Sequence, residues 1–332
     1  MIDDVLARGV TDGVFPLGRV EVFHRGQHVI SAGNASPGCV FDLASVTKVM
    51  STTALVLDTK LPIEARVREF FSSARVDASI ADLMFHRSGL PAFIPFFAKP
   101  EVNPLDGVLA AEPKHHGQAV YSDLGFILLG AILEKFTSTP LDELFEARIS
   151  RSAGYRRISK KLTLPLEFAR TGDTRPREPA PGQEGLWNVA EHPTALAEVD
   201  DDNAFVMDGV SGHAGLFGTA LDVAHFGQAM LEGRFAPPIP WKRDDTIVGS
   251  TRALGFDTPS PEGASCGQRF GRAGPLGAIG HLGFTGTSVW IDFDRQLVVA
   301  LLTNRVALGR ANVKIREFRP KLHDAVLDAL GL

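Results

Sequence analysis

The chain has 332 residues, 44% of them hydrophobic, and a mean hydropathy of +0.05, which is the composition of a water-soluble protein with one large domain or two interleaved ones. Lys and Arg total 34 against 39 Asp and Glu, for a net charge of −5, and no basic tract is present that could follow a phosphate backbone. We therefore expect no nucleic-acid partner. A membrane span is not expected either, because the longest apolar run, residues 124–133, is about half the length a span needs.

The N-terminus and the cysteines bear on the compartment. The opening residues, MIDDVLARGV, are acidic and lack the basic start and apolar run of a secretory signal. Cys39 and Cys266 have no metal-site spacing and are compatible with a reducing environment. We expect a cytoplasmic protein without a bound metal. Nothing in the sequence indicates an oligomeric state.

Strands are expected near both ends of the chain and helices between them. Period-2 alternation predicts two strands in residues 19–33, about a turn at 25–27, and two more in 287–304. Apolar helical patterns cover residues 45–58, 79–86, 123–136 and 219–231, the last opened by Thr219 and Asp222 in capping-box spacing. A final helical segment, 312–330, is interrupted by Pro320. Residues 160–204, rich in Pro, Gly and charge, are expected to form a long surface excursion.

This order of elements predicts one sheet built from distant parts of the chain. We place the sheet domain at residues 1–58 and 205–332, with 59–204 as a mostly helical insert. A cleft between sheet and insert is the expected place for a ligand.

Ser45 and Lys48 are the first candidate catalytic residues. At positions i and i+3 they share one face of a helix start, where the helix dipole favours negative charge on a hydroxyl. Serine is a poor nucleophile unless an adjacent base takes its proton. A Ser-x-x-Lys pattern is common, so a solvated serine and a surface lysine would explain it equally well. However, the surrounding helix is apolar almost all round, which would bury Lys48, and a buried lysine needs a reason.

Two further segments carry candidate site residues. Tyr121, Ser122 and Asp123 stand in a loop that enters an apolar helix; on its own, Tyr121 could equally be a packed aromatic. His281, Leu282 and Gly283 enter a strand, within a run in which glycine recurs every third residue from 271 to 286. Such glycines predict a pliable loop and a strand that another group approaches closely.

Together these elements resemble the serine β-lactamase and penicillin-binding-protein superfamily. The first motif is SVTK at 45–48, the second YSD at 121–123 and the third HLG at 281–283. The similar branch has Tyr-Ser-Asn as its second motif and includes class C β-lactamases, D-alanyl-D-alanine peptidases and family VIII carboxylesterases. The segments LMFHRSGLP (83–91) and GVSGHAGLFGTALDVAHFG (209–227) add to the likeness, which spans about residues 40–304.

The resemblance implies an α+β fold of the β-lactamase/transpeptidase type, with an antiparallel sheet flanked by helices and an inserted helical domain. It also implies a serine hydrolase that forms an acyl-enzyme on Ser45 and needs no cofactor. Lys48 and Tyr121 would move the proton, and the backbone N–H groups of Ser45 and Phe284 would form the oxyanion hole.

Three departures from the family pattern bear on the substrate. Asp123 replaces an Asn and offers no amide donor, His281 replaces a lysine in many relatives and is largely neutral at pH 7, and Leu282 replaces a threonine. β-Lactams and D-Ala-D-Ala peptides carry a carboxylate that these family residues would bind. We therefore expect small neutral esters as substrates. An amidase or D-amino-acid peptidase on peptidoglycan-derived peptides, with residual β-lactamase activity, is the alternative, and it would need a cationic group elsewhere. A sensor of β-lactams or peptides without turnover is the third.

The identity of the base stays open at this point. A carboxylate at Asp123 would raise the pKa of Lys48 and burial would lower it; if the carboxylate prevails, Tyr121, with a pKa lowered by Lys48, becomes the base.

Four other side chains are candidates for the substrate pocket. Phe93, Phe96 and Phe97 are interpreted either as core or as an acyl-pocket lid, and His213 either as a cleft residue or as a structural one. The acidic run 198–202 lacks the spacing of a calcium loop and is interpreted as a solvated turn.

Overall fold

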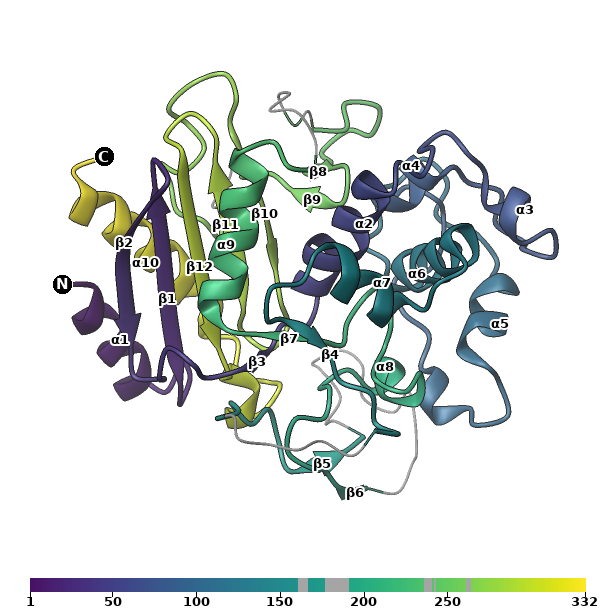
Figure 1. Ribbon diagram of the computed structural model, residues 1–332, viewed down its shortest axis with the longest axis horizontal. Coiled ribbons are helices and arrows are strands. Elements are labelled where there is room, and N and C mark those ends of the chain that lie inside the picture. The colour runs from purple at the N-terminus through teal and green to yellow at the C-terminus, as the bar shows by residue number, and fades with distance from the viewer. Residues whose placement is uncertain (161–166, 177–190, 236–240, 242, 261–263) are drawn as a thin grey trace.

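A seven-stranded antiparallel sheet drawn from both ends of the chain forms the centre of the computed structural model (Figure 1). The structure describes residues 1–332 except 161–166, 177–190, 236–240, 242 and 261–263. In spatial order the strands are β2 (Gln27–Gly33), β1 (Gly18–His24), β12 (Leu297–Thr303), β11 (Ser288–Asp292), β10 (Ala278–Leu282), β9 (Phe256–Asp257) and β8 (Arg252–Ala253). The four long strands expected near the termini are thus confirmed.

Strand β12 shows why the sheet must be covered on both sides. All its residues are buried, and successive side chains point to opposite faces. Leu297, Val299 and Leu301 face the helices α1 (Ile2–Thr11) and α10 (Ile315–Leu330). Val298 and Ala300 face α9 (Ala220–Leu231), which lies across the front of the sheet in Figure 1. Helix α9 opens with the expected capping box.

The middle of the chain supplies a helical layer at the other side of the molecule (Figure 1). It contains the π-helical segment η1 (Lys48–Thr53), α2 (Ala54–Asp58), α3 (Val67–Phe70), α4 (Ile80–Met84), α5 (Pro104–Leu109), α6 (Asp123–Thr137) and α7 (Leu141–Arg148). Helix α6 is buried along most of its length, so it anchors this layer. No single helix in the described part of the chain is long and apolar enough to cross a membrane; α6 and α7 together pass that test but are bent by 74°.

Two features differ from the sequence expectation. The interruption expected at Pro320 is wrong, since α10 runs continuously with Pro320 inside it. The packing of Phe318, Leu322 and Val326 into the core stabilises the helix on both sides of the proline. The region 160–204 lies partly outside the described residues, but the described part holds short strands, β5 (Thr174–Arg175) and β6 (His192–Pro193), and ends at α8 (Asp202–Val206). Two further short strands, β4 (Gly154–Tyr155) and β3 (Phe41–Asp42), pair with β7 (Leu216–Gly218). The domain limits at residues 58 and 205 stay a prediction.

Gly212, in the loop 209–215, sets how closely helix α6 approaches that loop. A Cβ atom at this position would collide with the carbonyl oxygen of Phe126 and press on the backbone of Gly130. The carbonyl of Gly212 also accepts a hydrogen bond from the Thr52 hydroxyl at 2.7 Å. The loop is therefore in backbone contact with α6 and hydrogen-bonded to a side chain of η1.

We expect Gly212→Ala to lower the free energy of unfolding by about 1–3 kcal/mol, the usual cost of overpacking. Urea denaturation followed by circular dichroism measures it. Gly38→Ala is the matched control, since a Cβ at Gly38 meets no atom within 4 Å. Equal stability of the two variants would contradict the close approach.

Candidate active site

The three sequence motifs meet at one cleft of about 870 Å³. The cleft lies where the end of β10, the start of α6, the start of α8 and the start of α10 converge. Its lining includes Ser45, Tyr121, Asp123, His281, Leu282, Gly283 and Phe284. Segments separated by more than 200 residues therefore contribute to one site.

Ser45 stands at a sharp turn between β3 and η1, partly exposed to the cleft. The preceding residue, Ala44, has φ = +47°, a conformation that costs energy for a residue with a side chain. The carboxyl group of Asp42 holds this turn, because its Oδ1 accepts a hydrogen bond from the Ala44 N–H at 2.8 Å. The strained backbone presents the serine hydroxyl to the cleft.

Lys48 is fully buried beneath the serine. Its Nζ donates to the Ser45 Oγ at 2.9 Å and to the His213 carbonyl at 3.1 Å, and lies 2.7 Å from Asp123 Oδ1. The ring centroid of Tyr121 is 5.0 Å from the same nitrogen. The buried lysine predicted from the apolar helix therefore has three polar partners, and the surface-lysine alternative is wrong.

The loop around His86 holds the second motif in place. The backbone N–H of Ser122 donates to His86 Nδ1 at 3.0 Å, and that of Asp123 donates to the Ala92 carbonyl at 2.9 Å. The Ser122 hydroxyl donates to the Pro91 carbonyl at 2.6 Å and caps α6. The rings of His86 and Tyr121 lie 4.7 Å apart. The HRSGLP segment therefore positions Tyr121 and Asp123.

Opposing effects set the charges of Lys48 and Tyr121. Burial is the largest effect on the pKa of Lys48 and lowers it, but the charges of Asp123 and Tyr121 and their hydrogen bonds outweigh it, so the pKa is raised. Burial raises the pKa of Tyr121, and the opposing charge of Lys48 does not reverse this. The Asp123 carboxylate thus outweighs burial in setting the pKa of Lys48, which is the condition under which Tyr121 was expected to become the base. However, the pKa of Tyr121 is not lowered, as that alternative also required. At neutral pH the pair is an ammonium and a phenol.

The third motif forms the edge of the cleft and is tied to the nucleophile turn. The hydroxyls of Thr285 and Thr287 donate to the carbonyls of Asp42 and Leu43, at 2.8 and 2.9 Å. Among the described residues, the backbone N–H groups of Ser45 and Phe284 have no acceptor. Burial, followed by the charges of Lys48 and Arg252, lowers the pKa of His281 well below its usual range, so it is neutral at pH 7.

The structure separates the remaining candidate pocket residues. Phe93 and Phe97 line the cleft, as do Leu282 and Gly283. Phe96 does not; it is buried in the core, where its ring lies against Gly107. His213 is also buried beneath the cleft, with Nδ1 2.8 Å from the Ser211 hydroxyl and Nε2 2.9 Å from Asp201 Oδ1. Its structural interpretation is therefore the better one.

Charged residues of the cleft are what sequence reasoning missed. Arg252, on β8, places its guanidinium 5.0 Å from the ring centroid of Tyr121 and 3.4 Å from Asp257. Arg252 is thus a candidate for the cationic group that the amidase alternative needs in place of a lysine at His281. The acidic run is not a solvated turn either, since Asp200 and Asp202 are buried and Asp201 caps α8 in the cleft wall. No local pattern around Arg252 marks it, because it reaches the site only through sheet pairing.

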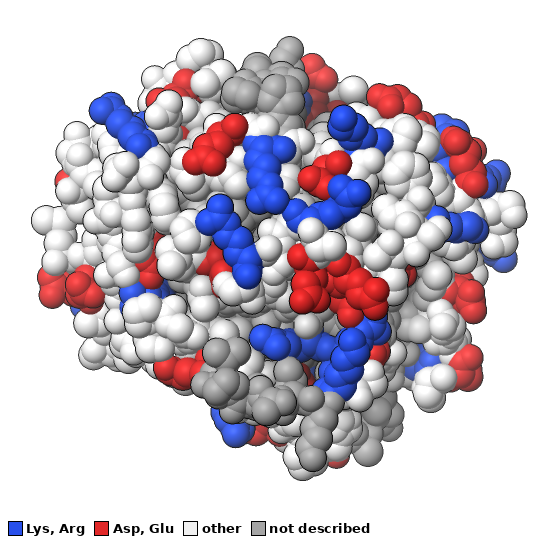
Figure 2. Space-filling view, in the orientation of Figure 1, with Lys and Arg blue, Asp and Glu red and all other residues white. Residues whose placement is uncertain are grey.

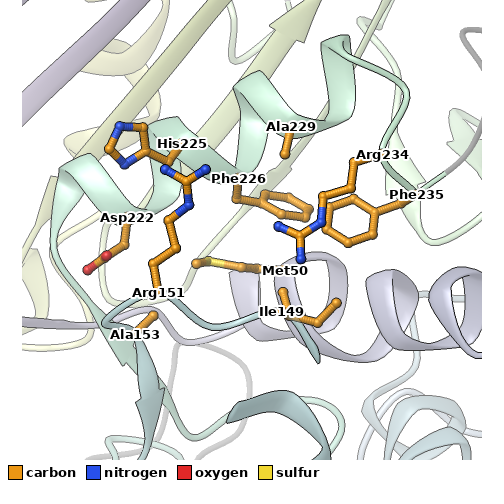
Figure 3. Close-up of a pocket in the computed structure, with 10 residues that line it drawn as sticks. All are labelled: Met50, Ile149, Arg151, Ala153, Asp222, His225, Phe226, Ala229, Arg234 and Phe235. Carbon is orange, nitrogen blue, oxygen red and sulfur yellow. The ribbon is translucent and has the colours of Figure 1, made fainter. Parts of the chain in front are cut away.

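Among the described residues, the face shown in Figure 2 and a second hollow show no comparable assembly. On the face in Figure 2, acidic and basic side chains lie side by side near the middle, without an extended area of one sign. The second hollow, between α9 and η1, measures about 20 Å³, close to the size of one water molecule. Figure 3 shows Met50, Phe226 and Phe235 crowded there, with the Arg234 guanidinium against the Phe235 ring.

The raised pKa of Lys48 makes its charge a source of stability. This contribution is complete below the unfolded pKa of about 10.4 and is lost as pH rises through the higher folded pKa. In Asp123→Asn, the effect of burial on Lys48 outweighs the remaining interactions, so the charged ammonium destabilises the folded protein. This destabilisation disappears once the pH is high enough for Lys48 to be neutral in both the folded and the unfolded protein. We expect the variant to lose about 3 kcal/mol of unfolding free energy at pH 7 and much less at about pH 11, measured by urea denaturation.

Asp77→Asn is the control, because Asp77 pairs with Arg66 at 2.9 Å on the surface. It should cause a much smaller loss that does not differ between the two pH values. A loss in Asp123→Asn that is independent of pH would show that Asp123 does not govern the charge of Lys48.

Comparison with known proteins agrees with this geometry. Residues 2–319 match the family model described as Beta-lactamase. An N-acetylmuramyl-L-alanine amidase of Bacillus subtilis (strain 168) is 32% identical over 314 residues, which cover 80% of this chain and 68% of the relative. EstCE1, a hydrolase with promiscuous acyltransferase activity, superposes with a TM-score of 0.64 at 18% identity, over 96% of this chain and 97% of its own. The D-amino acid amidase of Ochrobactrum anthropi SV3, complexed with D-phenylalanine, gives 0.68 at 15% identity, over 99% and 98%.

The expected β-lactamase/transpeptidase-like fold is therefore confirmed. The chain belongs to the β-lactamase family and is a serine hydrolase of that superfamily.

Proposed function

We propose that the protein is a serine amidase that acylates Ser45 and cleaves amide bonds in peptidoglycan-derived peptides. The observation that carries this proposal is the distance of 2.9 Å between Ser45 Oγ and Lys48 Nζ, with Tyr121 beside both at the cleft. The N–H groups of Ser45 and Phe284, which lack acceptors among the described residues, would bind the oxyanion of the tetrahedral intermediate.

Lys48 and Asp123 together provide a route for the serine proton. Because Lys48 is an ammonium at neutral pH, it can accept a proton from Ser45 only as it passes one of its own to Asp123, 2.7 Å away. The same proton then returns through Lys48 to the leaving nitrogen. Tyr121, hydrogen-bonded to both Ser45 and Lys48, offers a parallel path. Water would release the acyl group by the same steps in reverse.

Arg252 supports an amide over a neutral ester as substrate. The preference for esters was based on the departures at Asp123, His281 and Leu282, and Arg252 beside Tyr121 supplies the positive charge that His281 does not. The name of the B. subtilis relative specifies an N-acetylmuramyl-L-alanine amide. The side chains of Phe93, Phe97 and Leu282 in the cleft favour esters of apolar acids, which remain the second candidate. The cytoplasmic location stays a prediction from the sequence.

Ser45→Ala tests the acyl-enzyme. We expect wild-type protein to release the dipeptide from N-acetylmuramyl-L-alanyl-D-isoglutamine, detected by chromatography with mass spectrometry, and Ser45→Ala to lose at least a thousandfold in kcat/KM. p-Nitrophenyl butyrate, a D-Ala-D-Ala peptide and nitrocefin are assayed alongside. Turnover of the ester alone would replace the amidase by the esterase. Stoichiometric acylation of Ser45 without turnover would indicate a sensor.

Arg252→Gln tests the source of substrate charge. Loss of a charge-assisted hydrogen bond should lower kcat/KM for the muramyl dipeptide about tenfold or more, mainly through KM, and leave turnover of p-nitrophenyl butyrate within about twofold. Arg151→Gln, at the second hollow of Figure 3, is the control and should change neither. Equal losses on both substrates would mean that Arg252 only positions Tyr121.

A further inference from the structure

Four arginines line the Phe284 side of the same cleft. They are Arg305, Arg310, Arg316 and Arg319. Arg305 begins the short helix η3 (Arg305–Leu308), and two of the others extend from the first turns of α10. The guanidinium carbons of Arg305 and Arg310 both lie 4.5 Å from the ring centroid of Phe284. The cluster is thus built around the residue that follows the third motif.

Little negative charge balances this cluster. None of the four makes an ion pair within 4.0 Å among the residues that the structure describes. Asp200 is the acidic residue whose charge reaches Arg305. Asp201 and Asp202, in the same cleft, are engaged with His213 and Arg175. A surplus of positive charge therefore remains on this wall.

Burial makes the surplus costly. Arg319 is 5% exposed and Arg305 6% exposed. Burial and then the neighbouring positive charges of Arg305 and Arg316 lower the pKa of Arg319 to about 9, and burial lowers that of Arg305 to about 10. The Nε atoms of Arg310 and Arg319 are buried without a hydrogen-bond partner. Uncompensated buried charge of this kind normally requires a counter-charge.

A purely structural role explains only half of the cluster. Arg319 donates to the carbonyls of Gly283 and Thr287 at 3.0 and 2.8 Å, and Arg305 donates to that of Phe284 at 2.8 Å. These bonds support the turn of the third motif. The side chains of Arg310 and Arg316 make no hydrogen bond to a described residue, so they support no backbone and still add positive charge.

We propose that this arginine cluster is an anion subsite and that the substrate presents at least two negatively charged groups, carboxylate or phosphate, on the Phe284 side of the cleft. A single carboxylate would balance only part of four guanidinium groups. The subsite is separate from Arg252, which lies on the Tyr121 side. The substrate assignment depends on the proposed amidase function, whereas anion binding by the cluster does not.

The first experiment measures anion binding without catalysis. Citrate, tripolyphosphate and acetate are titrated into Ser45→Ala protein by calorimetry at constant ionic strength. We expect citrate, tripolyphosphate or both to bind at least tenfold more tightly than acetate. The anion that binds more tightly of the two identifies carboxylate or phosphate as the preferred group. Adding Arg310→Gln or Arg316→Gln should weaken that binding about fivefold or more, while Arg8→Gln, an exposed charge on α1, should not.

The second experiment uses two amides that differ by one charge. N-Acetylmuramyl-L-alanyl-D-glutamate carries one more carboxylate than its D-isoglutamine counterpart at nearly the same shape. We expect wild type to favour the glutamate compound about tenfold in kcat/KM, and Arg310→Gln and Arg316→Gln to reduce that preference, whereas Arg8→Gln should leave it unchanged.

The two readouts separate the two proposals. Anion binding that depends on Arg310 and Arg316, without amide turnover, would keep the subsite and overturn the amidase. Binding no tighter than that of acetate, or insensitive to both substitutions, would overturn the subsite even if the amides are hydrolysed.

Discussion

The burial of one positive charge organises the site. Lys48 is enclosed by an apolar helix, and an ammonium there is tolerated only because the Asp123 carboxylate, the Ser45 hydroxyl and the His213 carbonyl surround it. Each partner comes from a different part of the chain, so the charge brings the helix start, the α6 loop and the loop at 209–215 together. The backbone contact between Gly212 and α6 maintains the same arrangement.

The need to neutralise the buried charge of Lys48 links the stability of the fold to the chemistry of the site. Asp123 keeps Lys48 protonated, which satisfies the buried charge but leaves the lysine unable to act as a simple base. In the proposed mechanism the carboxylate at 2.7 Å resolves this conflict, because a proton enters the lysine as another leaves it. The strained backbone at Ala44 and the carboxyl group of Asp42 hold the serine in line with that exchange. Burial, together with repulsion from Asp200, raises the pKa of Asp42 to about 7, so the support of the nucleophile turn has its own dependence on pH.

The positive charge of the cleft is carried by arginines outside the third motif rather than by a residue at position 281. His281 is kept neutral by burial and by its cationic neighbours Lys48 and Arg252. Arg252 enters from the edge strand β8, and the arginine cluster enters from η3 and α10. The cleft is therefore cationic on two sides of the nucleophile, while the acidic residues at the start of α8 are largely paired. This distribution supports the proposed preference for anionic substrates over neutral ones.

The sequence by itself determined the elements whose cause is local. Period-2 alternation identified the strands at 18–33 and 288–303, and the apolar helix around Lys48 showed that the lysine would be buried. The motif residues Ser45, Tyr121 and His281 were identified from the sequence because their three short motifs together resemble one family. Only the tertiary structure decided which charges share the cleft. Arg252, Asp201 and Arg319 come from segments whose local pattern is ordinary, and the sign of each pKa shift depends on burial and on neighbours far away in the chain. The periodicity of a helix depends on residues only a few positions apart in the chain. The electrostatic field at Ser45 is instead a sum over charges that only folding brings within a few ångströms.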